Sequence, residues 1–122
     1  MELIARDLAT RTPWRVHAGI EGFPPPRLTG RGVPDILCER GHDTPPIAVE
    51  VELPETLVRR DTIRRLRDYV DAAVDIRVAV IADVDEHPDA IADTCRMLDC
   101  VGLAIPVAAI APDRSQVTGS AW

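Results

Sequence analysis

The sequence predicts one α/β domain over residues 1–122, in which three strands precede the first long helix. Apolar and polar residues alternate with a period of two in the first half, and apolar residues recur at helical spacing in the second half. The predicted order α-β-β-β-α-β-α-β gives a central mixed sheet flanked by helices. A doubly wound fold, with a helix after each strand, is disfavoured.

The first half is expected to contain a short helix and three strands. Residues 2–10 have helix-forming composition, and Thr12-Pro13 should close that helix. Alternating patterns predict strands over 14–21, 33–39 and 47–53. In the last of these, Ala48, Glu50 and Glu52 must share one face, opposite the apolar residues between them.

The second half alternates helices with strands. Pro54 suits the first turn of a helix, and an apolar stripe continues to about residue 74. The apolar run at 76–82 is typical of a strand covered on both faces. Pro88 and Gly102 are expected to bound a second long helix, in which Asp85 or His87 would serve as the N-cap.

Proline and glycine mark the irregular segments. Residues 22–32 include three consecutive prolines and predict a loop. Residues 103–110 predict the last strand, in which Pro106 indicates an edge position or a bulge. The tail over 112–122 is expected to be loosely held.

Composition indicates a soluble cytoplasmic protein. Hydrophobic residues make up 46% and charged residues 28%, with no apolar run long enough for a membrane span and no secretory signal at the N-terminus. Cys38, Cys95 and Cys100 form no C-x-x-C pair, which disfavours a disulfide framework and a thiolate zinc site. Buried, reduced thiols are the simpler expectation.

The net charge of −6 disfavours a nucleic-acid binder, but the charge is polarised along the chain. Between Glu55 and Arg67, five arginines face two acids, whereas the segment from Asp83 to Asp93 carries five acids. The arginines fit two interpretations, a solvated helix face or a surface that contacts phosphate.

Three carboxylates are expected to converge near the second and third strands. Asp35 lies near the start of the second strand, and Glu50 and Glu52 project from one face of the third. Carboxylates held close together repel one another and favour a compensating cation. Hard oxygen ligands suit Mg²⁺ or Mn²⁺, and one or two carboxylates with phosphate oxygens describe a phosphodiester-cleaving site.

Pro34-Asp35 followed by Glu50-Val51-Glu52 resembles the PD-(D/E)XK signature of the restriction-endonuclease-like nuclease superfamily. The resemblance implies a restriction-endonuclease-like core and Mg²⁺-dependent (or Mn²⁺-dependent) hydrolysis of nucleic acid, with DNA as the expected substrate. Asp35 and Glu50 would bind the metal. The third motif position is usually lysine, so Glu52 as a catalytic residue must instead accept a proton or bind a second metal.

Further residues match the family more weakly. Arg65 and Tyr69, four apart on one helix, resemble a glutamine-to-tyrosine pair found in some members. Arg31 and Arg59 are candidates for contacting substrate phosphate, and Glu2 could be the accessory acid that many members supply from an N-terminal helix. The resemblance also implies a homodimer or larger complex.

Other interpretations stay open. Val-Glu-Val-Glu is typical of any strand with one solvated face, and a nuclease-like fold could serve without catalysis as a nucleic-acid-binding or assembly module. An acidic domain that binds proteins is a third possibility. The histidines lack ligand spacing, although His17 would border the site if it shared a sheet face with Glu50.

Overall fold

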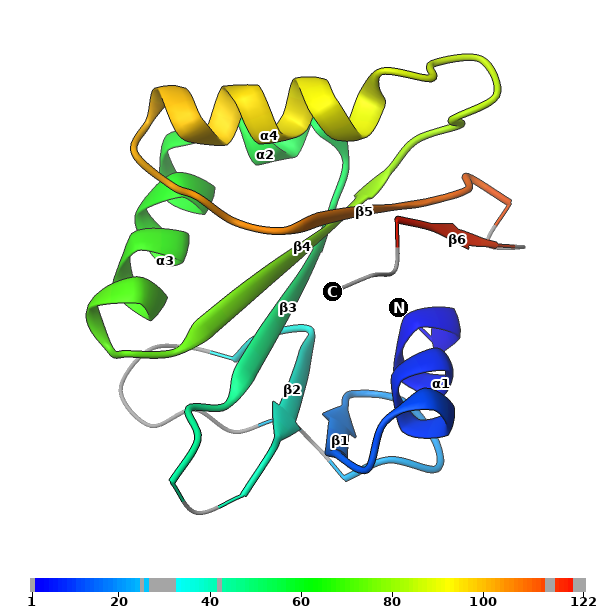
Figure 1. Cartoon of the computed structure of the whole chain (residues 1–122), viewed down its shortest axis with the longest axis vertical. Coiled ribbons are helices and arrows are strands. Elements are labelled where there is room, and N and C mark those ends of the chain that lie inside the picture. Colours follow the sequence, from blue (N-terminus) through cyan, green and yellow to red (C-terminus); the bar gives the residue numbers. More distant parts are fainter. Residues whose placement is uncertain (1, 25, 27–32, 42, 114–115, 120–122) are drawn as a thin grey trace.

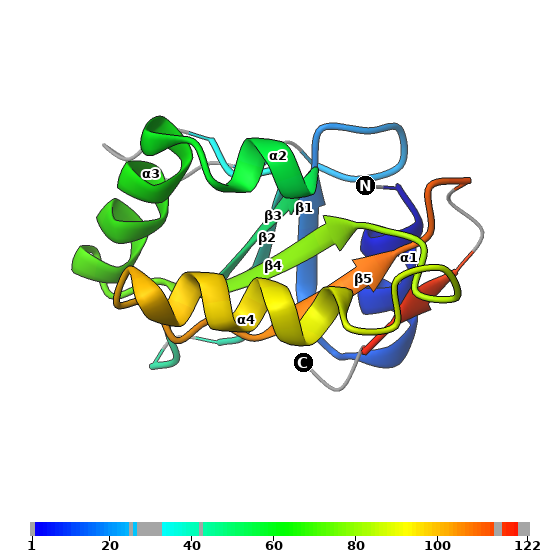
Figure 2. The same ribbon diagram turned by 90° about the horizontal axis from the view of Figure 1, so that it is seen from above.

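The computed structural model shows a mixed, curled six-stranded sheet with helices on both faces (Figure 1 and Figure 2). The structure describes residues 2–24, 26, 33–41, 43–113 and 116–119. The strands are β1 (Arg15–Ala18), β2 (Ile36–Glu39), β3 (Ile47–Glu52), β4 (Asp75–Ile81), β5 (Val107–Ile110) and β6 (Val117–Thr118). The helices are α1 (Glu2–Arg11), α2 (Pro54–Leu57), α3 (Arg60–Asp71) and α4 (Ala90–Cys100).

The strands lie in the sheet in their order along the chain, from β1 to β6. β1, β2 and β3 are antiparallel neighbours, β3, β4 and β5 are parallel neighbours, and β6 returns antiparallel to β5. Each parallel step needs a crossover connection, which α2 and α3 provide between β3 and β4 and α4 provides between β4 and β5. The α/β class and the predicted order of the first eight elements are therefore confirmed, apart from an interruption in the first long helix.

Two hydrophobic cores cover the two faces of the sheet. On one face α1 packs its buried residues, such as Ile4 and Leu8, against β1, β2 and β3. On the other face α3 and α4 contribute Leu66, Tyr69 and Leu98, which are fully buried. The period of two in β3 assigns its residues to these faces as predicted, because Val49 belongs to the α1 core and Ala48 to the α3 and α4 core.

Strand β2 begins at Ile36 rather than at residue 33. Pro34 has no N–H to donate to the sheet, and Val33 is exposed. The Asp35 carboxylate instead accepts the backbone N–H of Val51 at 2.8 Å. A side chain therefore replaces the backbone partner where the ladder between β2 and β3 ends, and this places Asp35 beside the last residues of β3.

The predicted long helix after Pro54 is two helices, α2 and α3. Arg59 is extended (φ −68°, ψ 143°) and stands at the N-cap of α3. The hydroxyl of Thr62 donates to the Thr56 carbonyl at 2.9 Å. This hydrogen bond adds a partner to a carbonyl in the last turn of α2, where carbonyls lack the N–H groups of a continuing helix. The apolar stripe in the sequence did not reveal the break, because it depends on these local hydrogen bonds.

β5 does not have the edge position that was one of the two expectations for Pro106, and part of the tail lies in the sheet. β6 pairs with β5, so the described part of the tail is held in the sheet and β5 is not an edge strand. Val117 packs against the α1 core, and the backbone N–H of Ala111 donates to the Gln116 carbonyl at 3.0 Å. Residues 114–115 and 120–122 lie outside the described residues.

The expected helix cap is also corrected. α4 starts after Asp89, which makes no capping hydrogen bond with its side chain, so neither Asp85 nor His87 is the N-cap. The Asp83 carboxylate accepts the backbone N–H of Asp85 at 2.9 Å and so shapes the turn that precedes α4.

The three cysteines are free thiols, of which Cys38 is buried, Cys95 half-buried and Cys100 exposed. The expectation of burial therefore holds fully for Cys38 alone, whose burial raises the pKa of its thiol to about 11. Across the described ranges, no helix combines the length and apolar character that a membrane crossing requires.

The end of α3 provides a test of backbone strain. Ala73 follows the helix with φ of 58°, in the left-handed region that glycine adopts without a Cβ penalty. We expect Ala73→Gly to raise the free energy of unfolding by about 1 kcal/mol, measured by urea denaturation. Ala92→Gly, at an exposed position inside α4, is the control and should lower it by about 1 kcal/mol. Equal destabilisation by both would refute the strain.

Candidate functional site

Glu50 is a buried carboxyl on the face of β3 that α3 covers. Only 2% of the residue is exposed to solvent. In the parallel pair of β3 and β4 it stands opposite Val78, which is fully buried. An ionised carboxylate in such surroundings is costly unless other groups compensate its charge.

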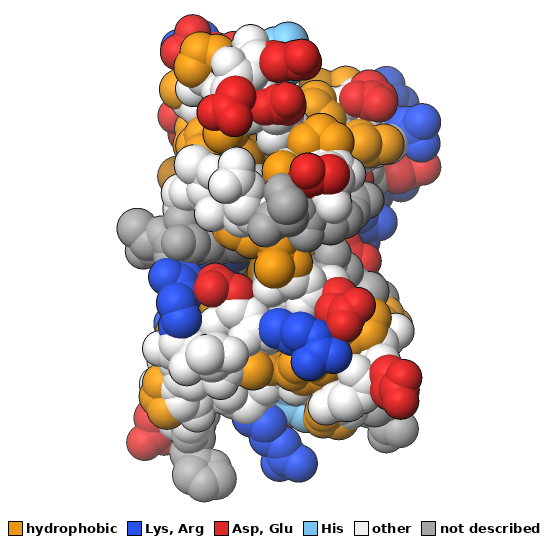
Figure 3. Space-filling view, turned by 90° about the vertical axis from the view of Figure 1, so that its right-hand side faces the viewer, with side chains coloured by type: hydrophobic (Ala, Val, Ile, Leu, Met, Phe, Trp, Pro, Cys, Tyr) orange, Lys and Arg blue, Asp and Glu red, His pale blue; other side chains and the backbone are white. Residues whose placement is uncertain are grey.

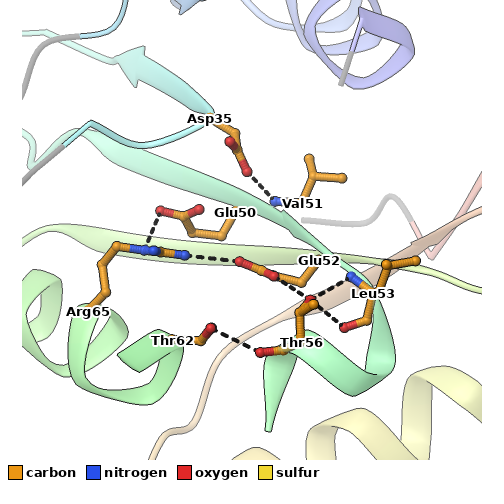
Figure 4. Close-up of polar contacts among 8 residues, drawn as sticks. All are labelled: Asp35, Glu50, Val51, Glu52, Leu53, Thr56, Thr62 and Arg65. Atoms are coloured by element: carbon orange, nitrogen blue, oxygen red, sulfur yellow. Dashed lines mark hydrogen bonds and ion pairs between the residues drawn. The ribbon is translucent and has the colours of Figure 1, made fainter. Parts of the chain in front are cut away.

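Asp35 and Arg65 lie beside Glu50 (Figure 4), and Tyr69 is its third neighbour. Asp35 approaches from the segment before β2. Arg65 comes from α3, with its Nε 3.5 Å from Glu50 Oε1. Tyr69, one helical turn later and fully buried, faces the same carboxyl. The predicted pairing of Arg65 and Tyr69 on one helix face is therefore confirmed.

These surroundings raise the pKa of Glu50 to about 7. Burial is the largest cause, and the negative charge of Asp35 acts in the same direction. Arg65 and the neighbouring Tyr69 hydroxyl favour the ionised form and partly offset the rise. Burial and the charge of Glu50 in turn raise the pKa of Tyr69. The charge of Glu50 is thus poised to change near neutral pH.

Glu52 lies beside Glu50 on the same face but has different partners (Figure 4). Arg65 Nη2 donates to Glu52 Oε1 at 3.0 Å, and the Thr56 hydroxyl donates to Glu52 Oε2 at 2.6 Å. One guanidinium therefore bridges Glu50 and Glu52. Both oxygens of Glu52 have protein partners, which fixes the orientation of its carboxylate.

Several polar atoms around Glu50 are buried without a hydrogen-bond partner. They are Glu50 Oε1, Arg65 Nε and the Tyr69 hydroxyl. Buried polar atoms in native proteins are normally satisfied. Glu50 Oε1 and Arg65 Nε face each other at 3.5 Å, and the Tyr69 hydroxyl neighbours the same carboxyl. Carboxylate oxygens such as those of Glu50 are ligands that suit a hard divalent cation.

The donor set limits what such a cation could contact. Among the described residues, no three or more His, Cys, Asp or Glu side chains form a group that could hold a metal ion. Asp35 and Glu50 are adjacent, whereas Glu52 is engaged by Thr56 and Arg65. Two carboxylates still match the one or two that Mg²⁺ usually takes from a protein.

Two other predicted site residues, Arg59 and Glu2, are not brought to Glu50. Arg59 is exposed, and no ion pair of the described structure includes it. Glu2 is exposed and pairs with Arg6 at 3.0 Å on α1, the helix that covers the opposite face of the sheet. Arg31 lies outside the described residues.

The register of the strands places His17 on the same sheet face as Glu50. His17 pairs with Leu37, which pairs with Ala48, and Ala48 shares its face with Glu50. His17 Nε2 is 3.5 Å from Glu39 Oε2, so its nearest charged partner is on β2. It extends the polar part of this face towards β1.

Thr56 is the site residue that the sequence did not reveal. Its hydroxyl accepts the backbone N–H of Leu53 at 3.1 Å while it donates to Glu52. A signal was present in the sequence, since a threonine two residues after Pro54 suits the first turn of a helix. The link to Glu52 depends on how α2 follows β3.

Surface charge is distributed unevenly. In Figure 3, acidic side chains gather at the top of the molecule, where β4 leads into α4. This position matches the acidic segment from Asp83 to Asp93. A polyanion is disfavoured at this segment.

Comparison of the chain with protein family models, with curated proteins and with solved structures finds no match.

The titration of Glu50 predicts how stability depends on pH. Its pKa is about 7 in the folded protein, against an ordinary value of 4.5, so the folded state retains a proton that the unfolded chain loses between these values. The stability contributed by Glu50 is therefore full below about 4.5 and is lost as the pH rises to about 7. Glu50→Gln cannot titrate, so its free energy of unfolding relative to wild type should increase across this range. Urea denaturation at a series of pH values measures the difference, and a constant difference would contradict the burial of a titrating carboxyl.

Proposed function

We propose that the protein is a divalent-metal-dependent phosphodiesterase that acts on nucleic acid and has a restriction-endonuclease-like core. The observation that carries the proposal is the adjacent pair Asp35 and Glu50, in which Glu50 is buried and its pKa is raised by burial and by the charge of Asp35. The order of the elements and the mixed sheet support the same assignment. So does the spacing of Pro34-Asp35 and Glu50-Val51-Glu52 along the chain.

Asp35 and Glu50 would hold Mg²⁺ or Mn²⁺ between β2 and β3. When bound, the metal would polarise the phosphate and lower the pKa of an attacking water. Asp35 keeps one carboxylate oxygen engaged with the Val51 N–H, which fixes its direction. Thr56 and Arg65 hold Glu52 beside Glu50, where its carboxylate is placed to orient water or accept a proton.

The substrate we propose is DNA, which has to reach the site at the end of β3 despite the acidic segment that follows the neighbouring strand β4. A second copy of the chain would place two sites on one duplex, so a homodimer is part of the proposal. Its basis is the family resemblance.

A non-catalytic role in nucleic-acid binding or assembly is the second candidate. The observation in its favour is Arg65, which already provides a positive charge to Glu50 and Glu52. In this alternative the acids and the guanidinium form a structural ion cluster, and no metal is required.

Asp35→Asn is the variant that tests the metal site. Asparagine keeps an oxygen that can accept the Val51 N–H, whereas alanine would leave that partly buried donor without this acceptor. We expect Asp35→Asn to remain folded, with Mn²⁺ affinity and nicking of supercoiled plasmid both reduced by about a hundredfold or more. Isothermal titration calorimetry and a plasmid assay measure the two effects.

Asp93→Asn is the matched control, because Asp93 is exposed on α4 and belongs to the acidic segment. It should bind metal and cleave as wild type does. Cleavage that persists in Asp35→Asn would refute the assigned site. Absence of Mn²⁺ binding in wild type would favour the non-catalytic candidate, and absence of DNA binding even at low salt would favour an acidic protein-interaction domain.

A further inference from the structure

We infer that Arg65 is a resident counter-ion of Glu50 and Glu52 which competes with a divalent cation for Glu50, and that its release from Glu50 provides a phosphate-binding group. The inference rests on the proposed metal site and specifies how that site is regulated. It concerns the one arginine that bridges both carboxylates in the described structure.

The geometry of Arg65 favours an exchangeable ion pair. Its Nη2 makes a direct hydrogen bond to Glu52 at 3.0 Å, whereas its Nε lies 3.5 Å from Glu50 Oε1 without hydrogen-bonding geometry. The contact of Arg65 with Glu50 is therefore an ion pair without a direct hydrogen bond. The side chain of Arg65 is 39% exposed, against 3% for that of Glu50, so part of Arg65 reaches solvent although its Nε is buried.

Charge balance explains why Arg65 occupies this position. Asp35, Glu50 and Glu52 bring three carboxyl groups to one corner of the sheet, and Arg65 is the cation paired with them. A divalent cation bound to Glu50 would lie within a few ångströms of the guanidinium, and two like charges at that separation repel strongly. Metal binding should weaken the contact between Arg65 and Glu50.

A released Arg65 would still be attached to α3 next to the metal. Its helix is anchored by Leu66 and Tyr69, which are fully buried, so only the side chain needs to move. A guanidinium presents a planar fork of donors that matches the oxygens of a phosphate. Metal and phosphate should therefore bind cooperatively, each increasing the affinity for the other.

Calorimetric titration of Mn²⁺ into wild type, Arg65→Gln and Arg65→Lys tests the competition. Removing the competing charge should make Mn²⁺ bind about tenfold more tightly to Arg65→Gln. Arg65→Lys keeps one charge but cannot bridge two carboxylates as a guanidinium does. Its affinity for Mn²⁺ should therefore lie between those of wild type and Arg65→Gln. Arg96→Gln, which breaks an exposed ion pair of the same 3.0 Å length on α4, should bind Mn²⁺ as wild type does.

A second readout uses inorganic phosphate as the probe. Phosphate should bind wild type at least about tenfold more tightly with saturating Mg²⁺ than without it, and this gain should be absent in Arg65→Gln. Thermal unfolding of each variant without metal establishes that it is folded. If Arg65→Gln does not fold without metal, the comparison of wild type with Arg65→Lys decides the question.

The results separate this inference from the proposed function. Wild type that binds Mn²⁺ through Asp35, with unchanged or weaker Mn²⁺ affinity in both Arg65 variants, would overturn the counter-ion inference and leave the metal site intact. No Mn²⁺ binding by any variant would overturn both. Tighter Mn²⁺ binding in Arg65→Gln together with loss of the Mg²⁺-dependent phosphate binding supports the inference.

Discussion

The burial of the Glu50 carboxyl between the sheet and α3 is the constraint on which the site depends. β3 is paired on both sides, so its side chains must point either to the α1 core or to the α3 core. Val49 and Val51 pack on the α1 side, which leaves the opposite side to Glu50 and Glu52. A carboxylate forced into that position needs compensation, and Arg65 and Tyr69 are the groups that favour its ionised form.

The late start of β2, at Ile36, creates the second half of the site. Pro34 cannot donate to the ladder, and Asp35 uses its side chain to accept the Val51 N–H. The same carboxylate raises the pKa of Glu50 by its charge. One residue therefore completes the backbone hydrogen bonding of β3 and makes the neighbouring acid harder to ionise. This double role ties the stability of the strand pair to the electrostatics of the site.

Local patterns made much of the fold predictable. The alternation in β3 was sufficient to place Glu50 and Glu52 on one face, because a period of two allows no other arrangement. The helical spacing of Arg65 and Tyr69 was likewise sufficient to put them side by side on α3. These inferences needed only geometry within a single element.

Features that depend on contacts between elements were not predictable. The two residues of β6 carry too short a pattern to indicate a strand, and they are held by pairing with β5. The bridge from Arg65 to Glu50 and Glu52 depends on how α3 packs against the sheet, and the role of Thr56 depends on the break before α3. The sequence indicated that Asp35 would lie near Glu50, but it did not indicate that Arg65 would pair with Glu50 and Glu52.

Anomalous X-ray scattering from crystals grown with Mn²⁺ tests the central claim most directly, because it locates the metal relative to the acids. The account predicts a peak at about 2.1 Å from carboxylate oxygens of both Asp35 and Glu50, with the Arg65 guanidinium turned away from Glu50. A protein crystal without a peak at these carboxylates, in which Arg65 still bridges Glu50 and Glu52, would contradict it.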